Sequence, residues 1–191
     1  TVASLLLATV ILGVAAPAAR AQITEPALLD SLQRTAFQYF WSEANATTGL
    51  IKDRSTPGSP CSIASLGFGF SAICIGIDHG WVTRETGRAR ILIALQTLWT
   101  APQGLATSGT IGYKGLYYHF LDMNTGMRTW TSELSTIDTA LLFAGIIDTR
   151  QYFNTADSLD VEVRALADSI TRRADWEFMR NGGPGLRMGW K

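Results

Sequence analysis

The sequence has few of the residues that build metal centres and disulfide scaffolds. Its 191 residues include only two cysteines and two histidines. Two thiols are too few for a disulfide framework, and the histidines, 40 positions apart, lack the spacing of metal ligands. Gly67-Phe68-Gly69 does not complete a dinucleotide fingerprint, and no phosphate-binding loop is present. We therefore expect no metal and no cofactor.

The chain also has no excess charge of either sign. Sixteen basic residues balance sixteen acidic ones, so the clustered positive charge that marks nucleic-acid binding is missing. Low charge with six tryptophans, five tyrosines and eight phenylalanines excludes an intrinsically disordered chain. The composition predicts a compact globular protein with no nucleic-acid partner.

The first residues predict an export signal. An uncharged apolar run over residues 2–16 is shorter than the roughly 20 residues of a membrane span. Ala19-Arg20-Ala21 then gives a small-x-small cleavage pattern. We expect residues 1–21 to be a cleaved signal peptide and the mature protein to have no stable membrane insertion.

The remaining chain predicts helices of two kinds in alternation. Amphipathic helices are expected over residues 24–45, after the capping residue Thr83 and from Asp157 towards Asn181. Between them, residues 62–77 and 132–147 are apolar or small on every side and predict buried helices. A ring of inner helices wrapped by outer ones gives this order, whereas a four-helix bundle would make every helix amphipathic. The pattern predicts an all-α fold, part of an α/α barrel, with a β-hairpin inserted over residues 116–130.

Several segments together resemble one known family. They occur in order along the chain and include Leu50-Ile51-Lys52-Asp53-Arg54, Gly80-Trp81-Val82-Thr83-Arg84, Tyr118-His119-Phe120 and Ser132-Glu133-Leu134-Ser135-Thr136-Ile137-Asp138-Thr139. This succession resembles the glycoamylase-like bacterial glycoside hydrolases, of the endo-β-1,2-glucanase (family 144) type. The resemblance implies an (α/α)6 barrel in a longer chain, of which residues 22–191 would be the amino-terminal part. It also implies a periplasmic or secreted enzyme acting on glucan.

Glycoside hydrolysis needs two carboxyl groups, one to protonate the leaving oxygen and one to act as base or nucleophile. Asp138 is the first candidate because it lies in an apolar helix, where an unpaired carboxylate would be costly. Its alternative is an ion pair, with Arg54 or Arg128, or a cap on a neighbouring loop. Glu133 is the second candidate, although a glutamate at a helix start also has a purely structural explanation. Five helical positions would point these two side chains in different directions, and the resemblance implies a further glutamate beyond Lys191.

Other residues are candidates for sugar contacts. Asp53 and Arg54 lie in a loop between an outer and an inner helix, where they could bind hydroxyl groups or orient a carboxylate. Tyr117, His119 and Trp130 belong to an aromatic-rich hairpin, and flat rings suit sugar faces. Strand alternation would place Tyr117 and His119 on one face, with Tyr118 and Phe120 packing on the barrel.

Two rival functions use the same residues. A non-catalytic exported carbohydrate-binding protein would bind sugar without releasing reducing ends, and a transglycosylase would make rings or longer chains. We expect a monomer that binds a glucan or oligosaccharide, and a chain of this length that is inactive alone.

Overall fold

The computed structural model describes residues 24–191, so the expected signal peptide lies outside the described residues. The described part is mostly helical, as predicted. Its helices are α1 (Glu25–Ser42), α2 (Ile63–Asp78), α3 (Arg84–Thr100), α4 (Thr136–Tyr152), α5 (Ser158–Arg172) and α6 (Trp176–Arg180). In this part of the chain, no helix combines the length and apolar character needed to cross a membrane.

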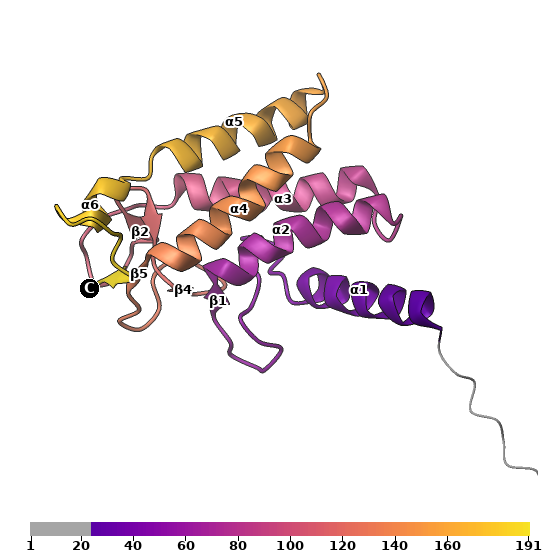
Figure 1. Ribbon diagram of the computed structural model, residues 1–191, viewed down its shortest axis with the longest axis horizontal. Helices are drawn as coiled ribbons and strands as arrows, with labels where there is room; N and C mark the ends of the chain where they lie inside the picture. Colours follow the sequence, from indigo (N-terminus) through magenta and orange to yellow (C-terminus); the bar gives the residue numbers. More distant parts are fainter. Residues whose placement is uncertain (1–23) are drawn as a thin grey trace, which may run out of the picture.

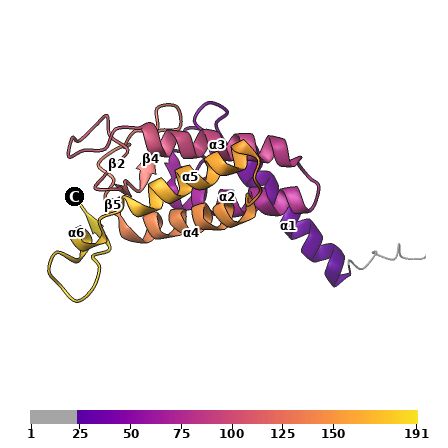
Figure 2. The same cartoon turned by 90° about the horizontal axis from the view of Figure 1, so that it is seen from above.

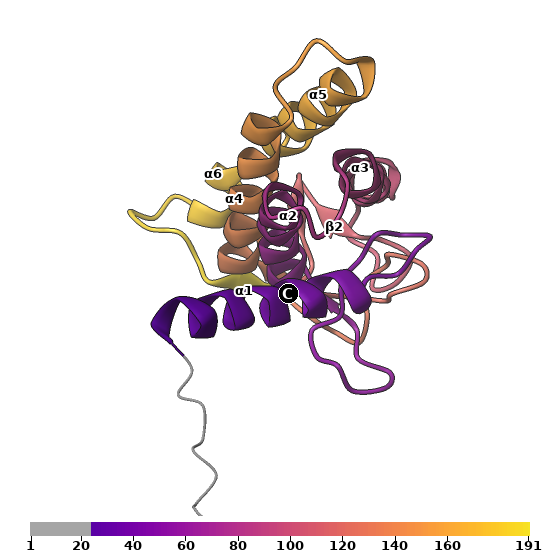
Figure 3. The same cartoon turned by 90° about the vertical axis from the view of Figure 1, so that its right-hand side faces the viewer.

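The helices pack around α2 and α4, the two that the sequence predicts as apolar. α2 contacts α4 and α1, α4 contacts α5, and α3 lies against α5. Figure 3 shows α1 and α5 on opposite sides of the α2–α4 pair. The predicted inner helices are therefore adjacent, with the predicted outer helices around them.

Glycines allow α2 and α4 to approach closely. A Cβ atom on Gly67 would lie 2.4 Å from the carbonyl oxygen of Leu141, and one on Gly145 would lie 2.0 Å from the carbonyl oxygen of Gly67. Both positions lie inside helices, where glycine costs about 1 kcal/mol relative to alanine. Close backbone packing explains why glycine is tolerated there, as the sequence suggested.

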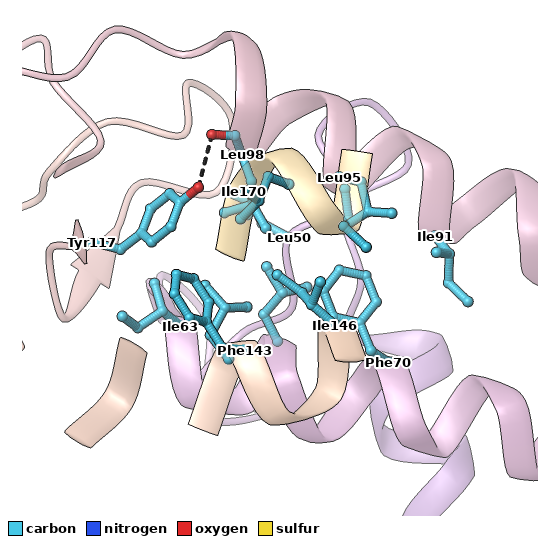
Figure 4. Packing of buried hydrophobic residues seen from close by; sticks show 14 of the residues in the cluster. Leu50, Ile63, Phe70, Ile91, Leu95, Leu98, Tyr117, Phe143, Ile146 and Ile170 are labelled. Carbon is cyan, nitrogen blue, oxygen red and sulfur yellow. Dashed lines mark hydrogen bonds between the residues drawn. The ribbon is translucent and has the colours of Figure 1, made fainter. Parts of the chain in front are cut away.

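The core lies between α3 on one side and α2 with α4 on the other. Figure 4 shows Leu95 and Leu98 of α3 facing Phe70 of α2 and Ile146 of α4. Cys61 and Cys74 are buried free thiols, as predicted, and burial raises the pKa of each to about 12. Both thiols are therefore protonated and unreactive at neutral pH.

The prediction that α2 and α4 are buried on every side is wrong for one face of each. Phe68 and Ile75 of α2 are exposed, as are Ile137 and Ile147 of α4. Among residues 24–191 no element covers these faces, so the apolar side chains there remain open to solvent.

Short antiparallel strand pairs gather at one end of the helices. β1 (Cys61–Ser62) pairs with β4 (Phe120–Leu121), and β2 (Gly112–Tyr113) pairs with β3 (Leu116–Tyr117). β5 (Leu134–Ser135) pairs with β6 (Gly189–Trp190). Figures 1 and 2 both show β2, β5, α6 and the C-terminus at the same end of the helices. The loops that join the helices at this end build the candidate site.

Two predicted helix boundaries and the predicted hairpin differ from the structure. α4 begins at Thr136 rather than Ser132, because Leu134 and Ser135 pair with β6. The last predicted helix is two helices, α5 and α6. The predicted turn at 124–126 is present and brings Leu121 opposite Arg128, but the strand containing Leu121 pairs mainly with β1.

Candidate active site

Strand pairing places His119 beside Glu133. Tyr118 is bridged to Leu134 in an antiparallel arrangement, and the backbone N–H of His119 donates to the Glu133 carbonyl oxygen at 2.9 Å. Glu133 thus precedes β5 and lies outside α4, which corrects the prediction that it begins the helix containing Asp138. The prediction that the side chains of Glu133 and Asp138 point in different directions assumed that one helix carries both. It therefore no longer follows.

The imidazole of His119 lies between two carboxylates. Its Nδ1 atom is 2.9 Å from Glu133 Oε1, and its Nε2 atom is 3.6 Å from Asp138 Oδ2. The first distance is that of a hydrogen bond, and the second is too long for one but close enough for a charge interaction. Three residues that the sequence singles out for chemistry are therefore brought together, and we call them the His119 cluster.

Ser135 fixes Asp138 at the start of α4. The backbone N–H of Asp138 donates to Ser135 Oγ at 3.2 Å, and the Ser135 hydroxyl donates to Asp138 Oδ2 at 2.5 Å. This is a reciprocal N-terminal cap. The predicted ion pair of Asp138 with Arg54 or Arg128 is wrong, since Arg54 bonds Asp53 and Arg128 donates to the Ser132 carbonyl. Asp138 is not a cap on a neighbouring loop either, because its capping partner Ser135 begins the same helix.

Glu133 has a lowered pKa despite partial burial. Burial alone would raise the pKa of its carboxyl, but hydrogen bonds from its own backbone N–H and from His119, with the positive charges of His119 and Lys191, outweigh this effect. The Glu133 side chain is 35% exposed and the Asp138 side chain 14%. The cluster therefore offers one ionised, accessible carboxylate and one more enclosed carboxyl group.

Asp53, Arg54 and Trp130 line a cleft close to this cluster. The cleft has a volume of about 400 Å³, and Phe120 and the loop over residues 56–60 also line it. Phe120 connects it to the cluster, because its ring stacks on the His119 ring with centroids 3.9 Å apart. The structure thus brings four of the five predicted sugar-contact residues into one region: Asp53, Arg54, His119 and Trp130.

The fifth candidate, Tyr117, belongs to the core. Its side chain is fully buried, its hydroxyl donates to the Leu98 carbonyl oxygen at 3.0 Å (Figure 4), and burial raises its pKa to about 12. The sugar contact that the sequence predicts for Tyr117 is wrong. Simple strand alternation fails here because β3 ends at Tyr117 and the chain turns into different pairings at Tyr118 and Phe120.

Two residues at the site are missed by the sequence reasoning. Phe120 was expected to pack on the barrel but stacks on His119 and lines the cleft. Ser135 carries a detectable signal, since serine three residues before an acidic residue is a capping pattern. Phe120 offers no comparable local signal, because pairing with distant β1 sets its direction.

The described residues contain no group of three histidine, cysteine or acidic side chains arranged to hold a metal ion. Within the cluster His119 and Glu133 share a hydrogen bond, and Asp138 accepts one from the neighbouring Ser135. What this arrangement can do is transfer protons and stabilise charge at a bond placed beside Glu133 and Asp138.

The chain is similar to proteins that act on β-1,2-linked glucans. It is 30% identical over 165 residues to an exo-β-1,2-glucooligosaccharide sophorohydrolase (non-reducing end) of Parabacteroides distasonis, covering 83% of this chain and 22% of that protein. No family model matches the chain.

Solved structures of similar proteins have the same fold over the matched part. A β-1,2-glucanase from P. distasonis superposes with a TM-score of 0.78 at 27% identity, over 89% of this chain and 24% of that one. A proposed glucoamylase from Bacteroides uniformis gives a TM-score of 0.79 at 27% identity, over 90% of this chain and 41% of that one. The chain thus spans less than half the length of these relatives. Over that part, the predicted resemblance to the glycoamylase-like glycoside hydrolases and their (α/α)6 fold is confirmed.

Proposed function

We propose that this chain carries part of the active site of a glycoside hydrolase that cleaves β-1,2-linked glucan. The observation that carries the proposal is His119 held between Glu133 and Asp138, in a chain similar to a sophorohydrolase and a β-1,2-glucanase. Paired carboxyl groups beside a sugar-sized cleft are what glycoside hydrolysis requires.

The lowered pKa of Glu133 suits a base or nucleophile, because the group is ionised at neutral pH. Asp138, on the opposite edge of the imidazole, is the second carboxyl group of the pair. His119 is then a positioning residue that keeps both oriented. Asp53 and Arg54, at the mouth of the adjoining cleft, contact sugar hydroxyl groups.

Export completes the proposal. The pattern over residues 1–21 is typical of a cleaved signal peptide, and a polymeric glucan is met outside the cytoplasm. We therefore propose a periplasmic or secreted, monomeric enzyme.

The test is release of reducing ends from linear β-1,2-glucan by the complete gene product, comparing the parent with its Glu133→Gln and Asp138→Asn variants. Each substitution removes an ionisable group with little change in shape, so each should slow turnover by about 10²–10⁴-fold. Asp168→Asn is a suitable control, because Asp168 pairs with Arg150 between α4 and α5, away from the cluster. Undiminished turnover in both cluster variants would overturn the proposal.

Binding and product measurements distinguish the rival functions. Calorimetric binding of β-1,2-glucose oligomers without any new reducing ends would favour a carbohydrate-binding protein. Rings or extended chains among the products would identify a transglycosylase.

A further inference from the structure

Trp130 has a conformation and an exposure that the fold itself does not explain. Its φ angle is 53°, a left-handed backbone conformation that costs a bulky residue about 1–2 kcal/mol. Its side chain is nevertheless 68% exposed, so burial offsets little of that cost. The residue sits in a turn in which the N–H of Ser132 donates to the Thr129 carbonyl at 3.4 Å, where glycine would be unstrained. Strained residues of this kind concentrate at ligand sites.

Trp130 also stands between two clefts. One is the cleft of Asp53 and Arg54, and the other, of about 420 Å³, opens between the end of α1 and the turn at residues 122–124. Both clefts are bordered by Trp130 and by Gly58, Ser59 and Pro60. Ligand bound across this boundary would pass over the indole ring.

Aromatic rings connect this boundary to the His119 cluster. The Trp130 ring meets the edge of the Phe120 ring with centroids 5.5 Å apart, and Phe120 stacks on His119. Successive rings therefore run from the carboxylates to the second cleft. Rings at such spacing suit a chain of sugar units, whose faces are apolar and whose rims are hydroxylated.

The second cleft has polar walls with little free charge. Lys52 Nζ lies 2.6 Å from Glu43 Oε2, and the third charged lining residue, Asp122, accepts from the backbone N–H groups of Asn124 and Thr125. Asn45 is fixed by the backbone N–H groups of Thr47 and Thr48, which donate to its side-chain oxygen. Asn45 in turn donates to the Asn124 oxygen at 3.1 Å, which leaves the Asn124 amide group to donate. Amides, a paired lysine and a hydrogen-bonded carboxylate beside a tryptophan fit an uncharged, hydroxyl-rich ligand.

We infer that the second cleft, lined by Glu43, Asn45, Lys52, Asn124 and Trp130, is a further sugar-binding position for the same glucan, with Trp130 as its stacking platform. This inference rests on the proposed function. It assigns the cleft a role in selecting substrates long enough to reach from the His119 cluster past Trp130.

The test measures binding without cleavage. In the complete gene product carrying Asp138→Asn, calorimetry with linear β-1,2-glucose oligomers of two to eight units should show affinity rising with length. Adding Trp130→Ala should weaken binding of the longest oligomers about tenfold and leave the shortest unchanged, so that the dependence on length is lost. Asn124→Ala should weaken only the long oligomers, by a few-fold.

Two further variants guard against an effect on folding. Trp130→Gly removes the ring and relieves the left-handed backbone, so it should fold at least as well as Trp130→Ala and show the same loss of long-oligomer binding. Trp99→Ala removes another exposed tryptophan, on α3, and should bind all oligomers as the parent does.

The outcomes separate the inference from the proposed function. An unchanged length dependence in Trp130→Ala and Trp130→Gly overturns the inference and leaves the hydrolase proposal standing. Length-dependent binding that requires Trp130, in a complete gene product whose parent form releases no reducing ends, supports the sugar position and overturns the hydrolase. A complete gene product that binds no oligomer overturns the inference.

Discussion

Two clusters of opposite charges in this molecule are held in different ways. Asp160 of α5 is completely buried and accepts hydrogen bonds from Arg84 at 2.7 Å, Arg88 at 2.6 Å and the Thr155 hydroxyl at 2.7 Å. Asp138 is partly exposed and has the Ser135 cap and an imidazole 3.6 Å away. Both are aspartates near a helix start, but one is fully bonded by the protein and the other is not.

The difference separates a structural role from a chemical one. The partners of Asp160 join α3 to α5, and its saturated oxygen atoms leave nothing to offer a ligand. Asp138 and Glu133 have fewer protein partners, so they keep oxygen positions free. The number of unfilled hydrogen-bonding positions, more than burial alone, distinguishes the candidate site from the structural cluster.

The largest effect is expected from a substitution that breaks the structural cluster around Asp160. Asp160→Asn leaves the buried Arg88 and the partly exposed Arg84 with less compensating charge and should lower the free energy of unfolding by about 3–5 kcal/mol, measured by urea denaturation. Asp168→Asn, which removes a half-exposed partner of Arg150, should cost about 1 kcal/mol or less. Equal effects of the two substitutions would contradict the contrast.

The same cluster predicts a pH dependence. Burial raises the pKa of Asp160, but the hydrogen bonds from Arg88, Thr155 and Arg84 outweigh it and hold the folded-state pKa well below the ordinary value. A lowered folded-state pKa means that the stabilisation is complete above the unfolded pKa of about 3.9 and is lost as the pH falls further. Asp160→Asn should therefore flatten the acid side of the stability curve below about pH 4.

A smaller effect is expected when the candidate site loses its positioning residue. His119→Gln should slow glucan cleavage by about 10–100-fold with little change in unfolding, because Glu133 and Asp138 remain but are less well oriented. His119 also helps to keep the pKa of Glu133 low. Its loss should raise that pKa and move the acidic limb of the pH–rate profile to higher pH. A lower rate with an unmoved limb would contradict the positioning role.

The smallest effect concerns Tyr117, which lies beside the site in sequence but inside the core in space. Tyr117→Phe removes the hydrogen bond to the Leu98 carbonyl and the contact with Arg173, which should cost about 1 kcal/mol of stability. Oligomer binding and cleavage rates should not change. A marked loss of binding would show that Tyr117 contributes to the sugar site and would contradict its assignment to the core.

Local features of the molecule could be predicted from the sequence. Thr83 caps α3 and Asp157 caps α5, because a capping side chain needs only its own neighbours. The apolar and small-residue patterns likewise predicted α2 and α4 as neighbours at the centre. Asp138 is a candidate because a carboxylate in an apolar helix is conspicuous, and His119 because it is the polar member of an aromatic hairpin.

Features that depend on distant pairing could not be predicted. Glu133 lies outside the expected helix because β5, which follows it, pairs with a strand more than 50 residues away. Phe120 faces His119 because β4 pairs with β1, and Tyr117 is buried because its hydroxyl reaches α3. A register set by remote strands has no signature in a local window.

The central claim is tested most directly by measuring Asp138→Asn and Asp160→Asn side by side, for the rate of reducing-end release from β-1,2-glucan and for the urea midpoint. We expect Asp138→Asn to lose about 10²-fold or more in rate with its midpoint nearly unchanged, and Asp160→Asn to lose stability while each folded molecule keeps its rate. If Asp138→Asn keeps its rate, or loses it only in proportion to unfolding, the His119 cluster is not the catalytic centre.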